Sequence, residues 1–506
     1  FMGELFPTMC SCDEFIFMPR VPGRYGLETL TGEMISDAIK RAKTLLPSLN
    51  DFQTTVTDPG ELADAAHLAR SIKSFLLEFE EVRSWQIDPT LYLRLINLSL
   101  ERVFTNHTLV GNKILEHLAI ILESIPVLLS SAADNLHGVP ETYRLAAMEM
   151  GPSTTAMLNE IITGFLSKNH LNPTRLKPLQ TRALETLETF MKDISGRPYV
   201  SSHFSVGKDL LNELLRASFG CEVPADEIRV WALEQVRFLE DELSQLAGQV
   251  RSGFSWREIY DSCDSTGCDR PLGVLYRDAV EKLASFFSSA ETDTPGSSRN
   301  LIIRETPPYL KPIRSDAAYR APDPTLPLSS GVFYIPATNS ESTRTRAGKE
   351  HLFLAAHETF PGHHLLDYHR LRQNNSVRRW IEAPLFYEGW ACYAESLVTD
   401  WGLSRRTEDR IILLKRRLWR VNRLLLEHDI HGGNISLKEA TGKLSSMGYD
   451  NDQARLLARR YTFNPGYQTT YSWGLHSIHE LKRKETGLET GLFERILLGE
   501  GQVPFT

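Results

Sequence analysis

The segment Leu352-Phe-Leu-Ala-Ala-His357-Glu358-Thr-Phe-Pro-Gly-His363-His364 joins an apolar helical run to a cluster of polar side chains. The run from Leu352 to Ala356 predicts a buried helix, which then carries an imidazole and a carboxylate next to each other. Burying such groups is unfavourable unless a hydrogen bond or a metal compensates them. Five of the 15 histidines lie close together in this region, at positions 351, 357, 363, 364 and 369. This clustering predicts a metal site.

The histidine spacing differs from the HExxH pattern, in which two histidines lie one helical turn apart and the glutamate is the general base. The fourth position here is Pro361, which cannot bind a metal. On a straight helix, His363 would point about 120° away from His357, whereas His364 would be nearly in phase. A Pro-Gly pair can bulge a helix and bring His363 back to the missing position. The spacing therefore leaves both residues open as the second ligand.

The composition is that of a folded globular protein, with 42% hydrophobic and 24% charged residues in 506. The formal net charge is −8 and no long run of like charges occurs, so we expect neither a nucleic-acid partner nor a membrane-binding surface. The longest apolar stretch, from Leu118 to Leu129, contains Glu123 and Pro126 and is short for a bilayer span. It predicts a buried helix and its end.

The first residues lack the basic start and apolar stretch of a signal peptide, and the six cysteines are too sparse for a disulfide scaffold. These features predict a cytoplasmic location. The oligomeric state is left open.

Apolar residues recur at helical spacing from about Leu27 to Phe287. Breaks are expected at Pro89, Gly138-Val-Pro140, Asn172-Pro173, Gly196-Arg-Pro198 and Pro224. An exposed loop is predicted from Ser288 to Asn300, followed by strands at Leu301–Arg304 and Gly331–Ile335. Four later helices are expected at about 346–358, 386–401, 408–429 and 437–447. We therefore predict a predominantly α fold with a small β-sheet next to the metal helix, organised as a helical lobe, 1–298, and a metal-site lobe, 299–506, within one continuous fold.

The pattern HExxPGHH from His357 to His364, followed by Glu388-Gly-Trp-Ala-Cys-Tyr-Ala-Glu395, resembles the bacterial family called domain of unknown function 885 (DUF885). The resemblance extends from Gly331 to about Gly474. Its further motifs are Asp429-Ile-His431, Arg460-Tyr461, Pro465-Gly466 and Tyr471-Ser-Trp-Gly474. Because that family is placed among the gluzincin-type zinc peptidases, the resemblance implies a multi-helical, zincin-like architecture.

The resemblance also implies a ligand set. Family members vary the second histidine of the pair, which favours His363 over His364, and Glu388 corresponds to the third ligand. Two histidines and one glutamate form a known catalytic zinc set with an open position for water. The family usually has HHLQ where this chain has His363-His-Leu-Leu366, so the role of that glutamine is absent or supplied elsewhere.

Several other residues are candidates for supporting roles. Glu395 lies seven residues after Glu388 on the same predicted helix face and could orient a ligand histidine. Asp429 and His431 are further candidates for that role or for contact with substrate. Spacing alone favours an ordinary exposed helix face for Glu388 and Glu395, and only the motif context favours a site.

The expected reaction is metal-assisted hydrolysis in which Glu358 takes a proton from water. Tyr471 is the first candidate to donate a hydrogen bond to the oxyanion, and His431 is the second. Considered without the family, Tyr471 would be a core aromatic residue.

The strand Gly331–Ile335, with Phe333 and Tyr334, precedes the metal helix, where zinc peptidases commonly place an edge strand that pairs with the substrate. Arg460 could bind a substrate carboxylate or form a structural salt bridge. The leading hypothesis is a zinc peptidase acting on small or unfolded peptides. The alternatives are a zinc hydrolase of other amides or esters, and a binding protein that has lost turnover.

Overall fold

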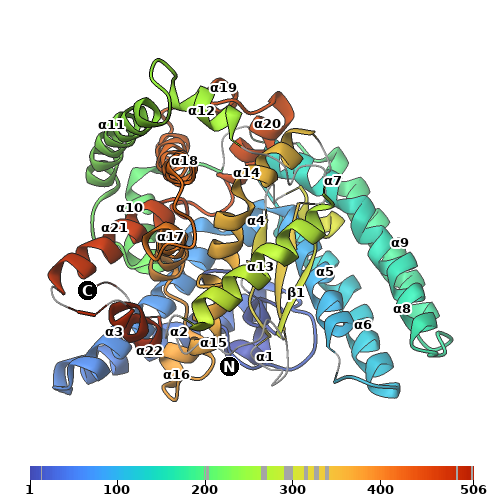
Figure 1. The fold of residues 1–506 in the computed structure, drawn as a ribbon. Helices are drawn as coiled ribbons and strands as arrows, with labels where there is room; N and C mark the ends of the chain where they lie inside the picture. The colour runs from blue at the N-terminus through green and yellow to red at the C-terminus, as the bar shows by residue number, and fades with distance from the viewer. Residues whose placement is uncertain are drawn as a thin grey trace. The chain divides into compact units, whose positions relative to one another are not determined.

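The computed structural model shows a predominantly α-helical protein with one small mixed sheet (Figure 1). It describes residues 1–12, 14–106, 108–198, 200, 204–263, 270–289, 300–312, 317–323, 330–336, 341–485, 488–489, 491–502 and 505. The loop expected at Ser288–Asn300 lies mostly outside these described residues. The expected helical class with a small sheet is confirmed.

Two compact units make up the chain, and each combines segments that are distant in sequence. Unit 1 contains 1–206, 307–315 and 323–329, and unit 2 contains 207–306, 316–322 and 330–506. Along the chain, the first change from unit 1 to unit 2 falls after residue 206, and the expected lobes, 1–298 and 299–506, stay a prediction. The change falls there because helices before residue 298 pack within unit 2, where α11 (Ala225–Val250) lies along α18 (Thr407–His431) and α13 (Leu272–Ser289) along α14 (Glu341–Glu358).

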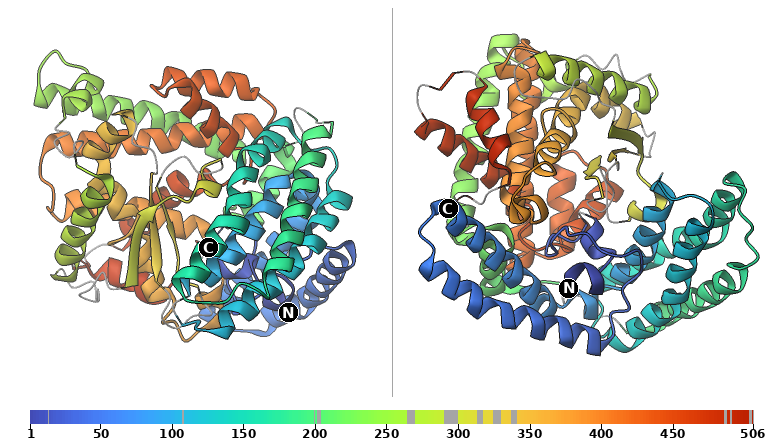
Figure 2. Two further views of the ribbon diagram at one scale, coloured as in Figure 1. Left: turned by 90° about the vertical axis from the view of Figure 1, so that its right-hand side faces the viewer. Right: turned by 90° about the horizontal axis from the view of Figure 1, so that it is seen from below.

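Unit 1 is built from helices whose starts and ends follow the expected Pro and Gly breaks. Its longer helices are α2 (Gly32–Thr55), α3 (Pro59–Leu77), α5 (Pro89–Thr105), α6 (Asn112–Asn135), α7 (Glu141–Ala156), α8 (Ile162–Lys168) and α9 (Lys177–Gly196). Short helices are α1 (Met2–Leu5) and α4 (Ser84–Ile87). Figure 2 shows the long helices from two further sides. Pro89 is the first residue of α5, where its missing N–H costs no hydrogen bond, and the Asp88 side chain accepts from Thr90 N. Residues 89–103 of α5 are all buried, so this helix forms the core of the unit.

Helix α6 is long and apolar enough to cross a membrane when judged by length and composition, with a mean hydropathy of 1.6 over its most apolar window. Half of that window is buried inside the protein. The buried positions, among them Leu118, Leu122 and Leu129, recur on one face, as in the core helix of a globular fold. The buried helix expected in the stretch from Leu118 to Leu129 is present, but it does not end there and continues through Pro126 to Asn135. Packing of the buried face outweighs the one backbone hydrogen bond that proline removes.

Unit 2 contains the sheet and the helices that carry the predicted site. Before the sheet lie α10 (Gly207–Phe219), α11, α12 (Trp256–Ser262) and α13. After it come α14, α15 (His363–Arg370), α16 (Ser376–Trp380), α17 (Pro384–Asp400), α18, α19 (Leu437–Ser446), α20 (Asn451–Arg460), α21 (Thr469–Lys484) and α22 (Leu492–Glu500). The four helices expected after the sheet are confirmed within a few residues at each end.

Three strands form the sheet in the order β1-β3-β2 (Figure 2, left). Strand β1 (Leu301–Glu305) is parallel to β3 (Gly331–Ile335), and β2 (Ala318–Arg320) is antiparallel to it. The sequence predicted β1 and β3 but missed the three-residue β2. Because β3 pairs on both sides, it is the central strand, and the expectation that it offers a free edge to a substrate is wrong. Phe333 and Tyr334 are buried in it.

The backbones of α17 and α21 meet at two glycines, Gly389 and Gly474. A Cβ atom built on Gly389 would lie 2.5 Å from the carbonyl carbon of Gly474, and one on Gly474 would collide with the carbonyl oxygen of Leu385. Only glycine permits this approach. The glycines of the Glu-Gly-Trp and Ser-Trp-Gly motifs therefore set the distance between two helices that carry candidate site residues.

We expect Gly474→Ala to lower the free energy of unfolding by about 1–3 kcal/mol, because the added methyl group forces α17 and α21 apart. Urea denaturation followed by tryptophan fluorescence measures the change. Gly442→Ala is the control, since Gly442 lies in α19 with nothing within 4 Å of the added Cβ and alanine favours a helix there. Equal stability of the two variants would contradict the close-packing argument.

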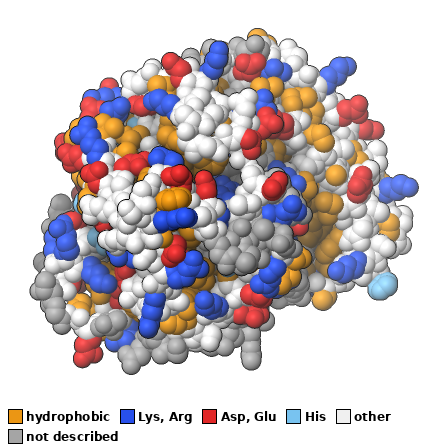
Figure 3. All heavy atoms as spheres, turned by 45° about the horizontal axis from the view of Figure 1, so that its top comes forward, with side chains coloured by type: hydrophobic (Ala, Val, Ile, Leu, Met, Phe, Trp, Pro, Cys, Tyr) orange, Lys and Arg blue, Asp and Glu red, His pale blue; other side chains and the backbone are white. Residues whose placement is uncertain are grey.

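The face in Figure 3 shows Lys and Arg side chains interspersed with Asp and Glu. No single sign of charge dominates this face.

Candidate metal centre

The Pro-Gly pair ends one helix and begins another. Helix α14 stops at Glu358 and α15 starts at His363, so the expected bulge within one continuous helix is wrong. The connecting turn folds back over the end of α14: Gly362 N donates to Ala356 O at 2.9 Å, and a side chain on Gly362 would collide with the carbonyl oxygen of His357. Trp390 of α17 holds the turn by donating from Nε1 to Pro361 O at 2.9 Å. This reversal brings His363 beside His357.

His357, His363 and Glu388 form a buried group with donor atoms within 4.8 Å of one another. Glu388 Oε2 lies 3.4 Å from Nε2 of each histidine. The two imidazole rings are nearly perpendicular, with centroids 4.9 Å apart. The three residues come from α14, α15 and α17, so the group depends on the packing of three helices.

The chemistry of these residues fits a metal ion. Glu388 Oε2 is buried and accepts no hydrogen bond from the described residues. Burial alone would raise the pKa of Glu388, but the neighbouring His363 and His357 hold it well below its usual value. A carboxylate and two imidazole nitrogens that converge on one buried point are the donor set of many zinc sites. The group could therefore hold a metal.

Two tyrosines that the sequence analysis missed hold the candidate ligands. Tyr467 donates from its hydroxyl to Glu388 Oε1 at 2.5 Å, which leaves Oε2 directed at the histidines. The ring of Tyr387 stacks on His363 with centroids 4.1 Å apart. The sequence offered one signal for each tyrosine: Tyr387 directly precedes Glu388, and Tyr467 directly follows Pro465-Gly466.

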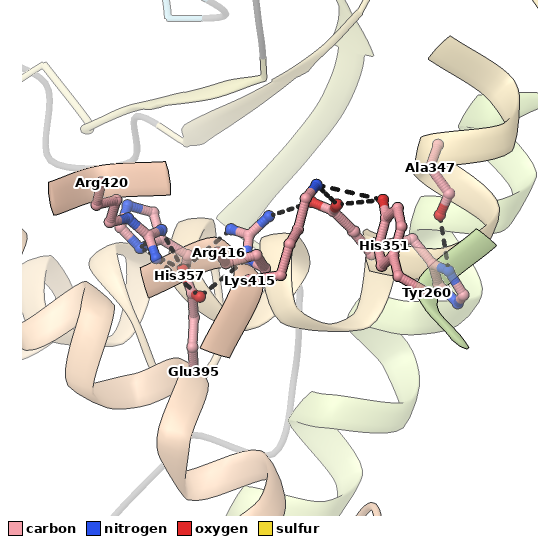
Figure 4. A network of polar contacts seen from close by, with 9 residues as sticks. Tyr260, Ala347, His351, His357, Glu395, Lys415, Arg416 and Arg420 are labelled. Carbon is pink, nitrogen blue, oxygen red and sulfur yellow. Dashed lines mark hydrogen bonds and ion pairs between the residues drawn. The ribbon is translucent and has the colours of Figure 1, made fainter. Parts of the chain in front are cut away.

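Glu395 connects the group to a network of buried charges (Figure 4). Its Oε1 lies 3.0 Å from His357 Nδ1. Arg416 donates to both of its oxygens, at 2.9 and 3.0 Å, and Arg420 donates to Oε2 at 3.0 Å and also to Oε1. Burial opposes the charge of Glu395, but the two guanidinium groups hold its pKa well below the usual value. Glu395 therefore stays ionised beside the histidine.

The network continues to Glu350 on α14. Glu350 accepts from Arg416 Nη1 at 3.0 Å, from Lys415 and from the hydroxyl of Tyr260 at 2.6 Å. Burial raises its pKa, but Lys415 and Arg416 outweigh that effect and lower it. No sequence motif indicated these α18 cations, because an isolated arginine pair is typical of a solvated helix.

Glu358 and Tyr471 line a cavity of about 110 Å³ together with His357. The Tyr471 ring stacks on His357 with centroids 6.2 Å apart and planes 18° apart. Arg460 lines the same cavity. The structure thus places the predicted base, the first oxyanion donor and the predicted carboxylate-binding residue around one space.

Other candidates lie elsewhere. Nδ1 of His364 is 3.1 Å from the hydroxyl of Tyr319 in β2, and burial lowers the pKa of His364 to about 4. His431 donates from Nε2 to the carbonyl oxygen of Tyr461 at 2.8 Å. The Asp429 carboxylate pairs with Arg229 of α11 and Lys443 of α19, at 3.2 and 3.5 Å. These three residues are outside the group of His357, His363 and Glu388.

The fold and this site define a mostly helical protein with a buried His-His-Glu group that could hold a metal. The family described as "Bacterial protein of unknown function (DUF885)" matches residues 25–506, and the chain belongs to this family.

Two solved structures share the fold. The first, titled a "putative lipoprotein of unknown function" from Shewanella oneidensis, has a TM-score of 0.75 and 16% identity, covering 95% of this chain and 92% of that chain. The second, titled "the putative lipoprotein from Colwellia psychrerythraea", has a TM-score of 0.70 and 15% identity, covering 93% and 89%. A comparison with curated proteins finds no match. At these identities the two structures show a common fold and no function.

Proposed function

We propose that this protein is a zinc-dependent hydrolase of the gluzincin type and that peptides are its substrates. The observation that carries the proposal is the convergence of His357, His363 and Glu388 on one point, with Glu358 lining the cavity beside it. A purely structural site would not need a carboxylate next to the ligands and facing a cavity. The family resemblance supports the zincin-like architecture.

The roles of the chain's residues follow from their positions. His357, His363 and Glu388 would hold zinc, which when bound makes a water molecule acidic and polarises a carbonyl group. Glu358 accepts the proton of the attacking water at its carboxylate and later donates it to the leaving amine. Tyr471 donates a hydrogen bond to the oxyanion; burial raises the pKa of its hydroxyl, which therefore keeps its proton. His431 is not needed for this role, because Tyr461 already accepts its hydrogen bond.

Strand β2 replaces β3 as the candidate partner of an extended substrate. It is an edge strand, and its Tyr319 lies near both histidines of the Pro-Gly motif: the ring is 6.2 Å from His363 and 5.7 Å from His364 by centroids. An edge strand next to a hydrolytic site favours peptides over other amides, because the backbone of an extended substrate can pair along such a strand.

The test is elemental analysis of the purified protein combined with a screen of dipeptides, N-blocked peptides, other amides and esters. We expect one zinc per chain and hydrolysis of peptides. A protein that stays metal-free after zinc reconstitution would refute the proposal. Zinc without turnover of any probe would instead favour the binding-protein alternative, and turnover of esters or non-peptide amides alone would favour the other hydrolase class.

The cytoplasmic location stays a prediction. Two similar structures are titled as lipoproteins, a class held at a membrane by a lipid anchor, so cell fractionation is the experiment that distinguishes the two locations.

A further inference from the structure

The cavity at Glu358 is lined by more cationic than anionic side chains. Its lining includes Arg346, Lys415, Arg416, Arg420, Arg423 and Arg460, against two carboxylates, Glu350 and Glu358. Most of this positive charge is compensated locally. Lys415 and Arg416 bind Glu350, and Arg416 and Arg420 bind Glu395. Arg346 also acts on Glu350, where it helps to lower the pKa of that carboxyl.

Arg423 and Arg460 differ from the other cations of the lining in their charge compensation. Within the described part of the chain, neither guanidinium forms an ion pair, and Arg423 Nε is buried without a hydrogen-bond partner. Arg423 Cζ lies 3.9 Å from the centroid of the Tyr471 ring. Both arginines are close enough to Tyr471 to act on its hydroxyl electrostatically. The two positive charges therefore lie beside the predicted oxyanion donor.

Arg423 also acts electrostatically on Glu427, but that carboxyl does not neutralise it. Burial raises the pKa of Glu427 well above its usual value, which favours the uncharged form, and Glu427 Oε2 accepts from Gln468 N at 2.9 Å. Partly buried cations without a counter-charge are unfavourable. An anionic ligand would remove this cost.

We propose that Arg423 and Arg460 together bind a carboxylate of the substrate close to the scissile bond, so that the protein selects anionic peptides. A guanidinium binds a carboxylate through two parallel hydrogen bonds, which fixes both position and orientation. The inference rests on the proposed hydrolase function and names its substrate class. The carboxylate is either the C-terminus of the peptide or an acidic side chain.

The rest of the substrate has room in a second cavity of about 870 Å³. The two cavities are neighbours, because five residues line both: Thr343, Arg346, Lys415, Trp419 and Tyr449. Trp256 and Tyr260 add further aromatic surface to the larger cavity, which suits the apolar side chains of a short peptide.

Three probes test the proposal: an N-acetylated tripeptide of neutral residues with a free C-terminus, its C-terminal amide, and the amide of a tripeptide ending in glutamate. Binding is measured by titration calorimetry on the full chain as purified, carrying Glu358→Gln so that no probe is consumed. We expect at least one carboxylate probe to bind about 10- to 100-fold more tightly than the neutral amide. The probe that binds more tightly than the neutral amide shows whether the bound carboxylate is the C-terminus of the peptide or an acidic side chain.

Matched variants assign the effect to the two arginines. Arg423→Gln and Arg460→Gln should each remove about tenfold from the affinity of the carboxylate probe and leave the neutral amide unchanged. Arg455→Gln, on the exposed face of the same helix as Arg460, should change neither. If a Gln variant does not fold, the corresponding Lys variant replaces it in the test. Lysine keeps the positive charge but not the paired hydrogen bonds, so this variant should lose part of the preference for the carboxylate probe over the neutral amide.

Equal binding of all three probes, or an equal loss on all three in the arginine variants, would overturn the inference. Selective carboxylate binding by the Glu358→Gln protein, combined with no hydrolysis of any probe by the zinc-loaded parent protein, would leave the carboxylate site standing and count against the hydrolase proposal alone.

Discussion

Glu358→Gln is expected to lower kcat by about 10²- to 10⁴-fold while zinc content and fold stay near those of the parent protein. Glu358 is the last residue of α14, directly after His357, and lines the cavity of about 110 Å³. It is not one of the three converging donors. The amide of glutamine has the shape of the carboxylate but cannot take a proton from water. Substrate affinity should change little, because the variant loses a proton acceptor and no binding surface.

Steady-state kinetics on a confirmed peptide and zinc analysis of the same sample measure the two quantities. Glu408→Gln, at the start of α18, is the control for a neutralised glutamate outside the cavity. A Glu358→Gln protein as active as its parent would show that another group is the base. Loss of zinc along with activity would show that Glu358 is a ligand.

His363→Ala is expected to abolish stoichiometric zinc binding, whereas His364→Ala keeps it. Nε2 of His363 points to Glu388 at 3.4 Å, while Nδ1 of His364 faces Tyr319 of the sheet. Loss of one ligand from a set of three leaves too few donors for tight binding, so the loss should exceed the roughly 10- to 100-fold effect of removing an outer hydrogen bond. His357→Ala and Glu388→Ala should behave like His363→Ala.

Zinc content after dialysis against a weak chelator ranks these variants. Circular dichroism shows whether each remains folded, which matters because all four side chains are buried. The reverse ranking, with zinc lost in His364→Ala and kept in His363→Ala, would mean that the chain runs through Pro361 as one straight helix.

Much of the secondary structure was predictable because its signals are local. Proline and glycine mark the ends of α5, α9 and α11, and apolar spacing marks the helices between them. The short strand β2 was not predictable, since three residues carry no period and its pairing with β3 is a long-range contact.

Some residues of the candidate site were likewise predictable from the sequence, and others were not. The apolar run before them marked His357 and Glu358 as chemically distinctive residues, because a buried imidazole or carboxylate is unfavourable unless it is hydrogen-bonded or bound to a metal. Glu388 was indicated by the family resemblance and not by its spacing. The sequence did not indicate Arg423, which has the same local pattern as any arginine on an amphipathic helix.

The sequence by itself determined the helical class, the β1 and β3 strands and the residue types from which a metal site can be made, since these depend on local propensity and periodicity. Only the tertiary structure decided which histidine faces Glu388, that β3 is a central strand, that His431 and Asp429 have other partners, and that Arg416 and Arg420 lie buried on Glu395. The physical reason is that each of these depends on side chains brought together from different helices or strands, as when the turn at Gly362 reverses the chain and places His363 beside His357. Such contacts follow from packing of the whole unit, which no local stretch encodes.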